Sequence, residues 1–336
     1  MTNLSDTIEP KTKEFLEKAN SAKGPALYEL SPEEARKVMD GLQGDIVQKS
    51  TANVEDRTIP GGPKGDVSFR IVRPESSKEL KDAKSSDQPL PVIIYIHGAG
   101  WVLGGWQTHD RLCLELANRV QAALVFVNYS LSPEAKYPVA IEESYIVAKW
   151  VAENAKLLNV DASRMAVAGD SVGGNMSIAL AMMAKELNGP KFVFQCLFYP
   201  VTDANFETGS YKQFGENHFL TTKAMKWFWN QYVEESKRDE PKVCPLKATK
   251  EQLTGLPPAL ILTAEHDVLR DEGEAFAHKL SNAGVTVRTA RVLGTIHDFV
   301  MLHVLAETPA AKLGIEIAAD QLKAHLHKEA AVSAKK

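Results

Sequence analysis

The residues best suited to catalytic chemistry lie in the pentapeptide G-D-S-V-G at 169–173, which fits the pattern G-x-S-x-G. An apolar run at 165–168 precedes it, and a helical pattern at 175–185 follows it. A serine on such a tight strand-to-helix turn is lifted to the edge of a sheet with a strained backbone. We therefore predict that Ser171 is a nucleophile rather than an ordinary helix cap.

A nucleophilic serine needs a base and an acid, and both are expected on loops that follow later strands. His297 follows the strand-like stretch 285–292 and is the predicted base. Asp267 follows an apolar run and is the predicted acid that orients it. Glu265 and Asp271 are the alternatives, although Glu265 is also suited to supporting the loop and Asp271 to capping the next helix.

The pentapeptide H-G-A-G-W at 97–101 directly follows another apolar run and is similar to a loop that supplies oxyanion-hole donors. We predict donor N–H groups at Ala99, Gly100 and Val172, with Gly98 as a flexible hinge. Alanine is acceptable in the middle of this loop if its φ is negative and its Cβ points away from the substrate.

The other histidines have simpler explanations. His97 is expected to make structural hydrogen bonds within its loop. The remaining seven are expected on helix surfaces, in an insertion or beside the acid: His109, His218, His266, His278, His303, His325 and His327.

Alternating strands and helices must position these groups. Continuous apolar runs, which are typical of strands covered on both faces, occur at 92–96, 123–127, 165–168 and 259–262. Helical patterns separate them at 108–121, 140–158, 172–187 and 271–283. This alternation predicts an α/β fold with a doubly wound, mostly parallel sheet. The order serine, acid, histidine is that of α/β-hydrolases and not of chymotrypsin-like or subtilisin-like proteases.

Two segments do not fit the alternation. Residues 201–240 are rich in aromatic side chains, and residues 11–50 read as helical, with a capping box at 31–34. We predict that the aromatic-rich insertion 201–240 forms part of a lid. The alternative is that the aromatic side chains only attach the insertion to the core. The polar stretch 75–90 is expected to be an exposed connection. An apolar stripe is expected to face the insertion: Ala35, Val38, Met39, Leu42 and Ile46.

The composition excludes several classes of protein. A net charge of −4 over 336 residues gives no broad attraction to nucleic acid or to an anionic membrane. The three cysteines are scattered, which argues against disulfides and a metal site. The polar N-terminus lacks the apolar core of a signal peptide, so we predict a cytoplasmic protein with no stable membrane insertion. The chemistry requires no cofactor.

At the level of whole motifs, the sequence resembles the hormone-sensitive-lipase-like carboxylesterases. The matching motifs are HGAGW at 97–101, YSLSPEAKYP at 129–138, GDSVGGN at 169–175, LPPALILTAEHDVLRDEG at 256–273 and IHDF at 296–299. The resemblance implies a helical cap formed by residues 1–50 and 201–240, over a catalytic core formed by residues 51–200 and 241–336. It also implies hydrolysis of short to medium acyl-chain esters, with Ser171, Asp267 and His297 as nucleophile, acid and base. The sequence departs from the family at Ala99 and Asp298, where glycine is usual.

Several alternatives stay open at this point. The same triad serves acyltransferases, lactonases and amidases, and the same fold serves as a small-molecule receptor in gibberellin perception when the base is lost. The expected partner is a small ester, and a homodimer is compatible with the sequence. Asp298 has two interpretations: the N-cap of a helix beginning at Phe299, which the geometry of adjacent side chains favours, or a carboxylate that raises the pKa of His297.

Overall fold

Eight strands form one sheet in the computed structural model, which describes residues 5–44, 49–75 and 88–327. The strand order is β1-β2-β4-β3-β5-β6-β7-β8, with antiparallel pairing of β1 with β2 and of β2 with β4, and parallel pairing elsewhere. The strands are β1 Ala52–Gly62, β2 Gly65–Pro74, β3 Leu90–Ile96, β4 Ala123–Asn128, β5 Val160–Asp170, β6 Phe194–Phe198, β7 Ala259–His266 and β8 Val287–Ile296. The predicted mostly parallel sheet is confirmed.

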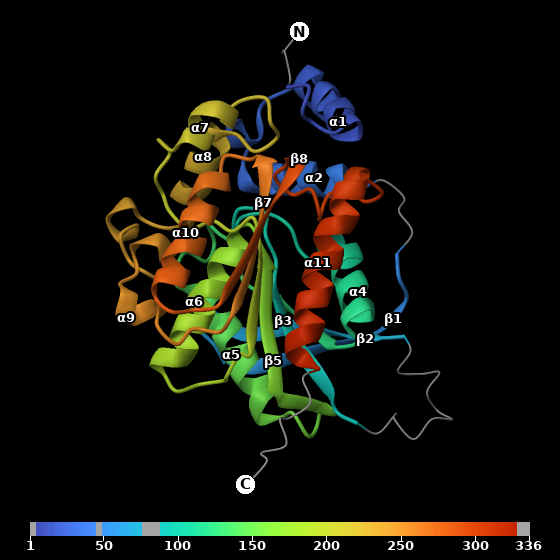
Figure 1. Cartoon of the computed structure of the whole chain (residues 1–336), viewed down its shortest axis with the longest axis vertical. Helices are drawn as coiled ribbons and strands as arrows, with labels where there is room; N and C mark the ends of the chain where they lie inside the picture. The colour runs from blue at the N-terminus through green and yellow to red at the C-terminus, as the bar shows by residue number, and fades with distance from the viewer. Residues whose placement is uncertain (1–4, 45–48, 76–87, 328–336) are drawn as a thin grey trace.

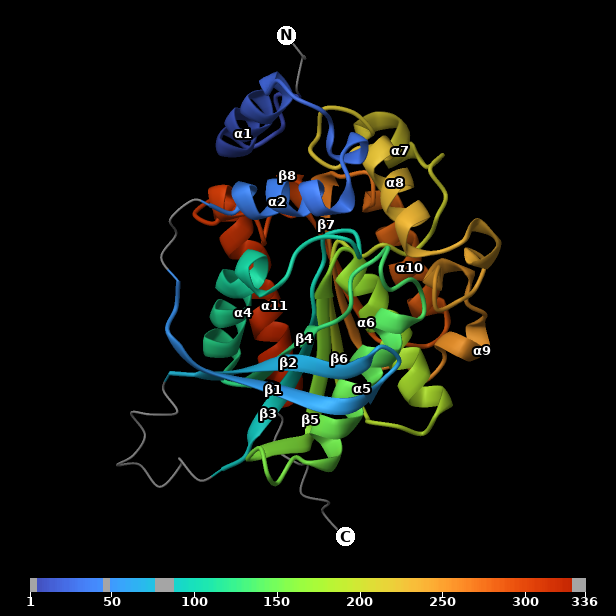
Figure 2. The same ribbon diagram turned by 180° about the vertical axis from the view of Figure 1, so that it is seen from behind.

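Helices cover both faces of this sheet, which explains the continuous apolar runs within its central strands. In Figures 1 and 2, α4 and α11 lie on one face, and α5, α6 and α10 lie on the other. Their bounds are α4 Trp106–Val120, α5 Val139–Glu153, α6 Val172–Glu186, α10 Arg270–Asn282 and α11 Pro309–Leu326. The residues of β3 from Val92 to Ile96 are completely buried between these layers.

A third group of helices lies above the carboxyl ends of the parallel strands (Figure 1). It combines two distant parts of the chain: α1, the short 3-10 turn η1 and α2 near the N-terminus, and α7 and α8 from the segment after β6. Their bounds are α1 Pro10–Ser21, η1 Leu27–Glu29, α2 Pro32–Leu42, α7 Gly209–Phe214 and α8 Thr222–Tyr232. Loops that leave the sheet at this end therefore meet side chains from both parts.

Helix α2 begins as the sequence predicts, because Ser31 accepts the amide N–H of Glu34 and the Glu34 carboxylate accepts the amide N–H of Ser31. The predicted apolar stripe is wrong at Val38, whose surface is 52% exposed. Ala35 and Met39 are buried, and their i, i+4 spacing turns Val38 to the edge of the buried face. Ile46 and most of the stretch 75–90 lie outside the described residues.

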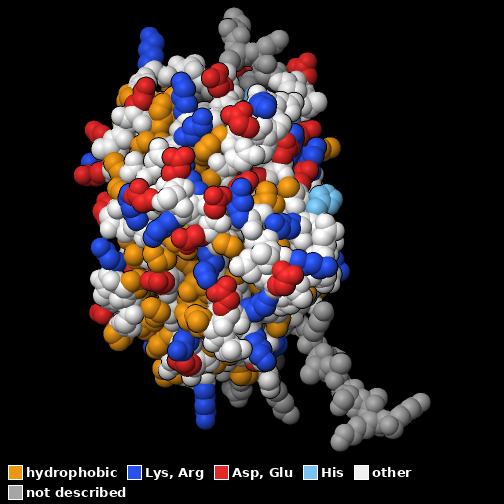
Figure 3. All heavy atoms as spheres, turned by 90° about the vertical axis from the view of Figure 1, so that its left-hand side faces the viewer, with side chains coloured by type: hydrophobic (Ala, Val, Ile, Leu, Met, Phe, Trp, Pro, Cys, Tyr) orange, Lys and Arg blue, Asp and Glu red, His pale blue; other side chains and the backbone are white. Residues whose placement is uncertain are grey.

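The surface shown in Figure 3 mixes basic and acidic side chains, so this face carries no extended field of one sign. Among the described residues, no helix is both long enough and apolar enough to cross a membrane.

Candidate active site

Ser171 lies on the turn between β5 and α6, and its backbone has φ 53° and ψ −119°. The strained backbone predicted for this position is thus confirmed. A Cβ on Gly169 would collide with the backbone of Gly173, and a Cβ on Gly173 would collide with the carbonyl of Ile96. Both glycines are therefore required by close packing of the turn against β3.

The three residues predicted to act together do converge. Nε2 of His297 lies 2.9 Å from Oγ of Ser171, and Nδ1 lies 2.7 Å from Oδ2 of Asp267. An ionised carboxylate only accepts hydrogen bonds, so Nδ1 donates to Asp267 and Nε2 is left to accept the serine proton. Oδ1 of Asp267 accepts the amide N–H of Leu269 at 3.0 Å, which fixes the carboxylate.

The two alternative acids have other partners. Glu265 accepts the amide N–H of Gly294 at 2.7 Å and so supports the loop, as the sequence suggested. Asp271 is not the helix cap that we predicted, because α10 begins one residue earlier with Leu269 at the cap position. Its carboxylate instead accepts the amide N–H of Ser210 at 2.7 Å, joining α7 to α10.

Asp298 corrects another expectation. No α-helix begins at Phe299, and the segment continues as turns before a short 3-10 helix, η5 His303–Leu305. The side chain therefore caps nothing, and Oδ1 of Asp298 lies 3.4 Å from Nε2 of His297 without a hydrogen bond from any described residue. The interpretation of Asp298 as a neighbouring charge is the one that fits this geometry.

Electrostatics around His297 follow from this arrangement. Burial by itself lowers the pKa of His297, but the carboxylates of Asp267 and Asp298 outweigh it and raise the pKa to about 9. Burial raises the pKa of Asp298 to about 6, although the nearby His297 opposes the shift. Asp170 adds to the same field from the far side of the site.

The oxyanion loop also departs from expectation. Ala99 has φ 75°, so the negative φ that we gave as the condition for alanine at this position is not met, and Gly100 and Trp101 are left-handed as well. A Cβ on Gly98 would collide with the Asp170 carboxylate, so glycine is needed there for close approach and not as a flexible hinge.

The N–H of Gly98 donates to Oδ1 of Asp170 at 3.1 Å, so it is not free to donate to an oxyanion. Within the described ranges, the amides of Ala99 and Gly100 have no backbone or side-chain acceptor. Val172 is the first residue of α6, where an amide has no partner inside the helix. Ala99, Gly100 and Val172 therefore keep their N–H groups for a ligand.

A buried polar cluster beneath this loop was missed by sequence reasoning. Asp170 is completely buried and accepts the hydroxyl of Tyr95 at 2.7 Å, while its second oxygen lies 3.2 Å from Nε2 of His109. His109 was expected on a helix surface but is 1% exposed. Burial disfavours both charges, yet the Asp170 carboxylate raises the pKa of His109 and the imidazolium lowers the pKa of Asp170. This pair anchors the oxyanion loop through Gly98.

His97 lies in the same cluster and has the structural role predicted from the sequence. Its ring contacts the carbonyl of Gly98 at 2.9 Å and stacks on Tyr129 and Phe126. Burial lowers the pKa of His97 to about 3, so the ring is neutral.

Hydrogen bonds join the segment that follows His297 to the end of α2, and no sequence motif predicted this contact. Gln43, at the end of α2, donates to the carbonyl oxygens of Thr108 at 2.8 Å and Met301 at 3.1 Å. Its own side-chain oxygen accepts the amide N–H of His303 at 2.9 Å. His303 is therefore another buried histidine that was wrongly expected on a helix surface.

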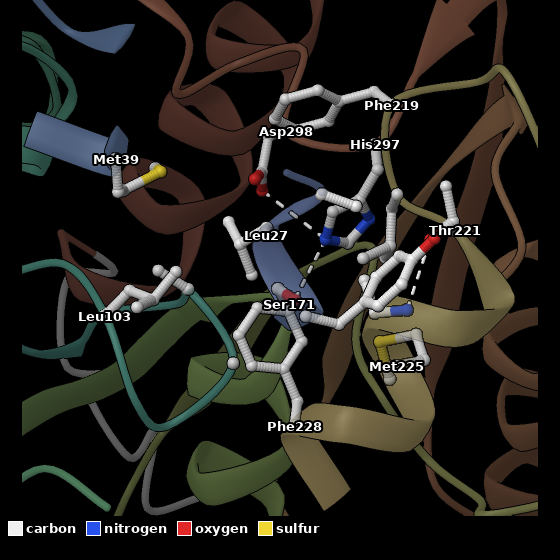
Figure 4. Close-up of a pocket in the computed structure, with 16 residues that line it drawn as sticks. Leu27, Met39, Leu103, Ser171, Phe219, Thr221, Met225, Phe228, His297 and Asp298 are labelled. Carbon is white, nitrogen blue, oxygen red and sulfur yellow. Dashed lines mark hydrogen bonds and ion pairs between the residues drawn. The ribbon is translucent and has the colours of Figure 1, made fainter. Parts of the chain in front are cut away.

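Ser171 and His297 open onto a cavity of about 230 Å³ (Figure 4). Its walls are mostly apolar and come from the helices above the sheet and from the oxyanion loop: Leu27, Met39, Leu103, Phe219, Met225 and Phe228. Other aromatic side chains of the 201–240 segment do attach it to the core, since Tyr232 stacks on Trp101 with ring centroids 4.1 Å apart. No group of three or more His, Cys, Asp or Glu residues in the described ranges is arranged to hold a metal ion.

Comparison with known proteins now identifies the family. A model of the α/β-hydrolase fold matches residues 93–301, more than half of the chain. This chain belongs to the hormone-sensitive-lipase-like α/β-hydrolases.

The similarity to individual α/β-hydrolases extends over nearly the whole chain. This chain is 43% identical over 317 residues to an α/β hydrolase of Acanthamoeba polyphaga mimivirus, and the match covers 94% of this chain and 88% of the relative. It is 37% identical over 276 residues to the carboxylesterase NlhH of Mycobacterium tuberculosis, covering 82% of this chain and 83% of NlhH. The crystal structure of a thermostable esterase from Pseudomonas putida superposes with a TM-score of 0.91 at 46% identity, covering 97% of this chain and 100% of that esterase.

The neighbouring charge of Asp298 predicts a measurable pH effect. Activity should rise with pH as His297 loses its proton. The apparent pKa of the acidic limb of kcat/KM should lie above 6.5, the pKa of an unperturbed imidazole. Asp298→Asn removes a charge that favours imidazolium, so the limb should move to lower pH by about one unit. Asp239→Asn removes a carboxylate that is 93% exposed and should leave the limb in place. An unmoved limb in Asp298→Asn would show that this carboxylate does not influence the base.

The anchoring of the oxyanion loop predicts a second effect. Asp170→Asn weakens the contacts that hold Gly98 and should lower kcat by about 10²-fold, the cost of losing one oxyanion-hole donor. Tyr95→Phe keeps the carboxylate and the Gly98 contact, so it should reduce thermal stability while kcat changes much less. A folded Asp170→Asn protein, judged by circular dichroism, with unchanged kcat would contradict this role.

Proposed function

We propose that this protein is a serine carboxylesterase that hydrolyses short to medium acyl-chain esters through an acyl-enzyme intermediate. The observation that carries the proposal is the single imidazole of His297, which contacts both Ser171 and Asp267 at the mouth of an apolar cavity. The esterase names of the relatives, NlhH and the Pseudomonas putida enzyme, support the same class of reaction.

The geometry supports a specific order of events. His297 takes the proton of Ser171 as its Oγ attacks the ester carbonyl, and Asp267 stabilises the imidazolium that results. The amides of Ala99, Gly100 and Val172 stabilise the oxyanion. The proton on Nε2 then passes to the leaving alcohol.

Water repeats these steps on the acyl-enzyme, so acylation and deacylation use the same residues. Lactones and amides would react with the same groups, and an acceptor other than water would give acyl transfer. Hydrolysis of simple esters is favoured because a small, largely apolar cavity suits an acyl chain. A receptor that only binds its ligand is disfavoured, because His297 is in place and hydrogen-bonded. Cytoplasmic location and a homodimer stay predictions from the sequence.

We further propose that residues 1–50 and 201–240 act as the cap of this site, over a catalytic core formed by residues 51–200 and 241–336. Leu27 and Met39 from the first segment, and Phe219 and Phe228 from the second, line the cavity around Ser171. The acyl chain would then contact side chains that the sheet itself does not supply.

The nucleophile can be tested by labelling. Ser171→Ala should lower kcat by about 10⁴-fold or more while the protein stays folded, because the three residues act as a unit. A fluorophosphonate probe should label the unaltered protein and fail to label Ser171→Ala. The control is Ser177→Ala, which removes another buried hydroxyl from the same helix and should keep full labelling. Full labelling of Ser171→Ala would refute the assignment.

The cap can be tested through acyl-chain length. p-Nitrophenyl esters should be hydrolysed best between butanoyl and octanoyl and poorly beyond, because each buried methylene gains about 0.8 kcal/mol only until the cavity is full. Met39→Ala enlarges the cavity and should shift the optimum to longer chains. Val38→Ala alters the exposed neighbour on the same helix and should not. An optimum that is identical in all three proteins would argue against a wall formed by α2.

A further inference from the structure

Within the part of the chain that the structure describes, the buried carboxylate of Asp298 makes no hydrogen bond that would hold parts of the fold together. The residue is 5% exposed, and neither carboxylate oxygen accepts a hydrogen bond from any described residue. Figure 4 shows the side chain among those lining the cavity, with its oxygens turned toward His297. A buried carboxylate without a hydrogen-bond donor is costly to fold, because water is removed from it and, of the described residues, only the imidazole of His297, 3.4 Å away, faces it.

The backbone does not demand an aspartate either. Asp298 has φ 64°, a left-handed conformation in which glycine is free of strain and aspartate is only tolerated. A side chain at this position therefore adds backbone strain as well as a desolvated charge. A ligand that donates a hydrogen bond to the carboxylate would offset the cost of removing water from it.

The place of the carboxylate defines which part of a substrate it can meet. The leaving-group oxygen must approach Nε2 of His297, because that nitrogen delivers the proton. Oδ1 of Asp298 lies 3.4 Å from the same nitrogen, whereas Asp267 occupies the opposite nitrogen, Nδ1. A donor that reaches Asp298 must therefore sit close to the leaving-group oxygen, on the alcohol side of the ester.

We propose that Asp298 is a binding residue for a hydrogen-bond donor on the alcohol portion of the substrate, one or two carbons from the ester oxygen. The substrate class is that of monoesters of vicinal diols and esters of β-amino alcohols, whose second hydroxyl or ammonium group would contact the carboxylate. The inference rests on the proposed esterase function and specifies the substrate side of the same site.

The rest of the cavity strengthens the assignment. Asp298 is the single carboxylate among the described residues that line it. The hydroxyl of Thr221 also lines it but already accepts the amide N–H of Ala224 at the start of α8. A donor on the substrate therefore has one charged acceptor available.

The test compares two esters that differ by one group, 2-hydroxyethyl butanoate and n-propyl butanoate. A hydroxyl replaces a methyl between them, while the acyl part is the same. The measured quantity is the ratio of their kcat/KM values, at a pH where Asp298 is ionised. A change at His297 affects both esters alike and cancels in this ratio.

Asp298→Gly is the informative variant, because glycine suits the left-handed backbone and removes both oxygens. We expect the ratio to fall by about tenfold relative to the unaltered protein, as for loss of a hydrogen bond to a charged group. Asp298→Asn, which loses the charge and keeps one acceptor, should give an intermediate value. Asp239→Asn is the control, since it changes a carboxylate that is 93% exposed and should leave the ratio unchanged.

The possible results distinguish a failure of the Asp298 proposal from a failure of the proposed esterase function. A ratio that is the same in the unaltered protein and in Asp298→Gly would overturn the inference, while continued hydrolysis of n-propyl butanoate would uphold the esterase function. Absence of hydrolysis of both esters by the unaltered protein would overturn both. A fall in the ratio confined to the Asp298 variants is the result that we expect.

Discussion

The strained turn at Ser171 is the constraint on which the rest of the site depends. Close packing of Gly169 and Gly173 against the end of β3 leaves no freedom in this turn. The turn therefore presents the serine hydroxyl to His297 and places Val172 at the N-terminus of α6. Asp170, the residue just before the serine, is directed down into the protein and holds that loop through Gly98. One backbone conformation thus places the proposed nucleophile and, through Asp170, orders the loop of the proposed oxyanion donors.

The site buries three carboxylates close together, those of Asp170, Asp267 and Asp298. Asp267 is matched by His297, and Asp170 is matched by His109 and by two hydrogen-bond donors. These two pairs are satisfied within the protein, as buried charges must be. Asp298 differs because its nearest positive partner is an imidazole already shared with Ser171 and Asp267. Asp267 and Asp170 are thus satisfied within the protein, whereas the carboxylate of Asp298 is the one that we propose to contact a substrate.

Much of this could be predicted from the sequence, because doubly covered strands leave apolar runs and the site residues follow directly after them. Sequence reasoning failed where the decisive fact was a contact between distant segments or a single dihedral angle. Helical periodicity could not show that His109 faces Asp170, and the residue type of Ala99 gave no sign of its positive φ. Asp298 looked like a helix cap because the apolar residues after it suggested a helix that does not form. An aspartate directly before the serine and a histidine on the helix after the oxyanion loop were the available signals for the buried pair.

The central claim is that Ser171 carries the acyl group between the ester and water. The most direct measurement is mass spectrometry of the protein quenched in acid during turnover of p-nitrophenyl butanoate, followed by peptide mapping. The account predicts a butanoyl mass increase confined to the peptide that contains Ser171, formed in a burst that matches release of the first equivalent of p-nitrophenol. A butanoyl group found on another residue, in a protein that turns over normally, would contradict it.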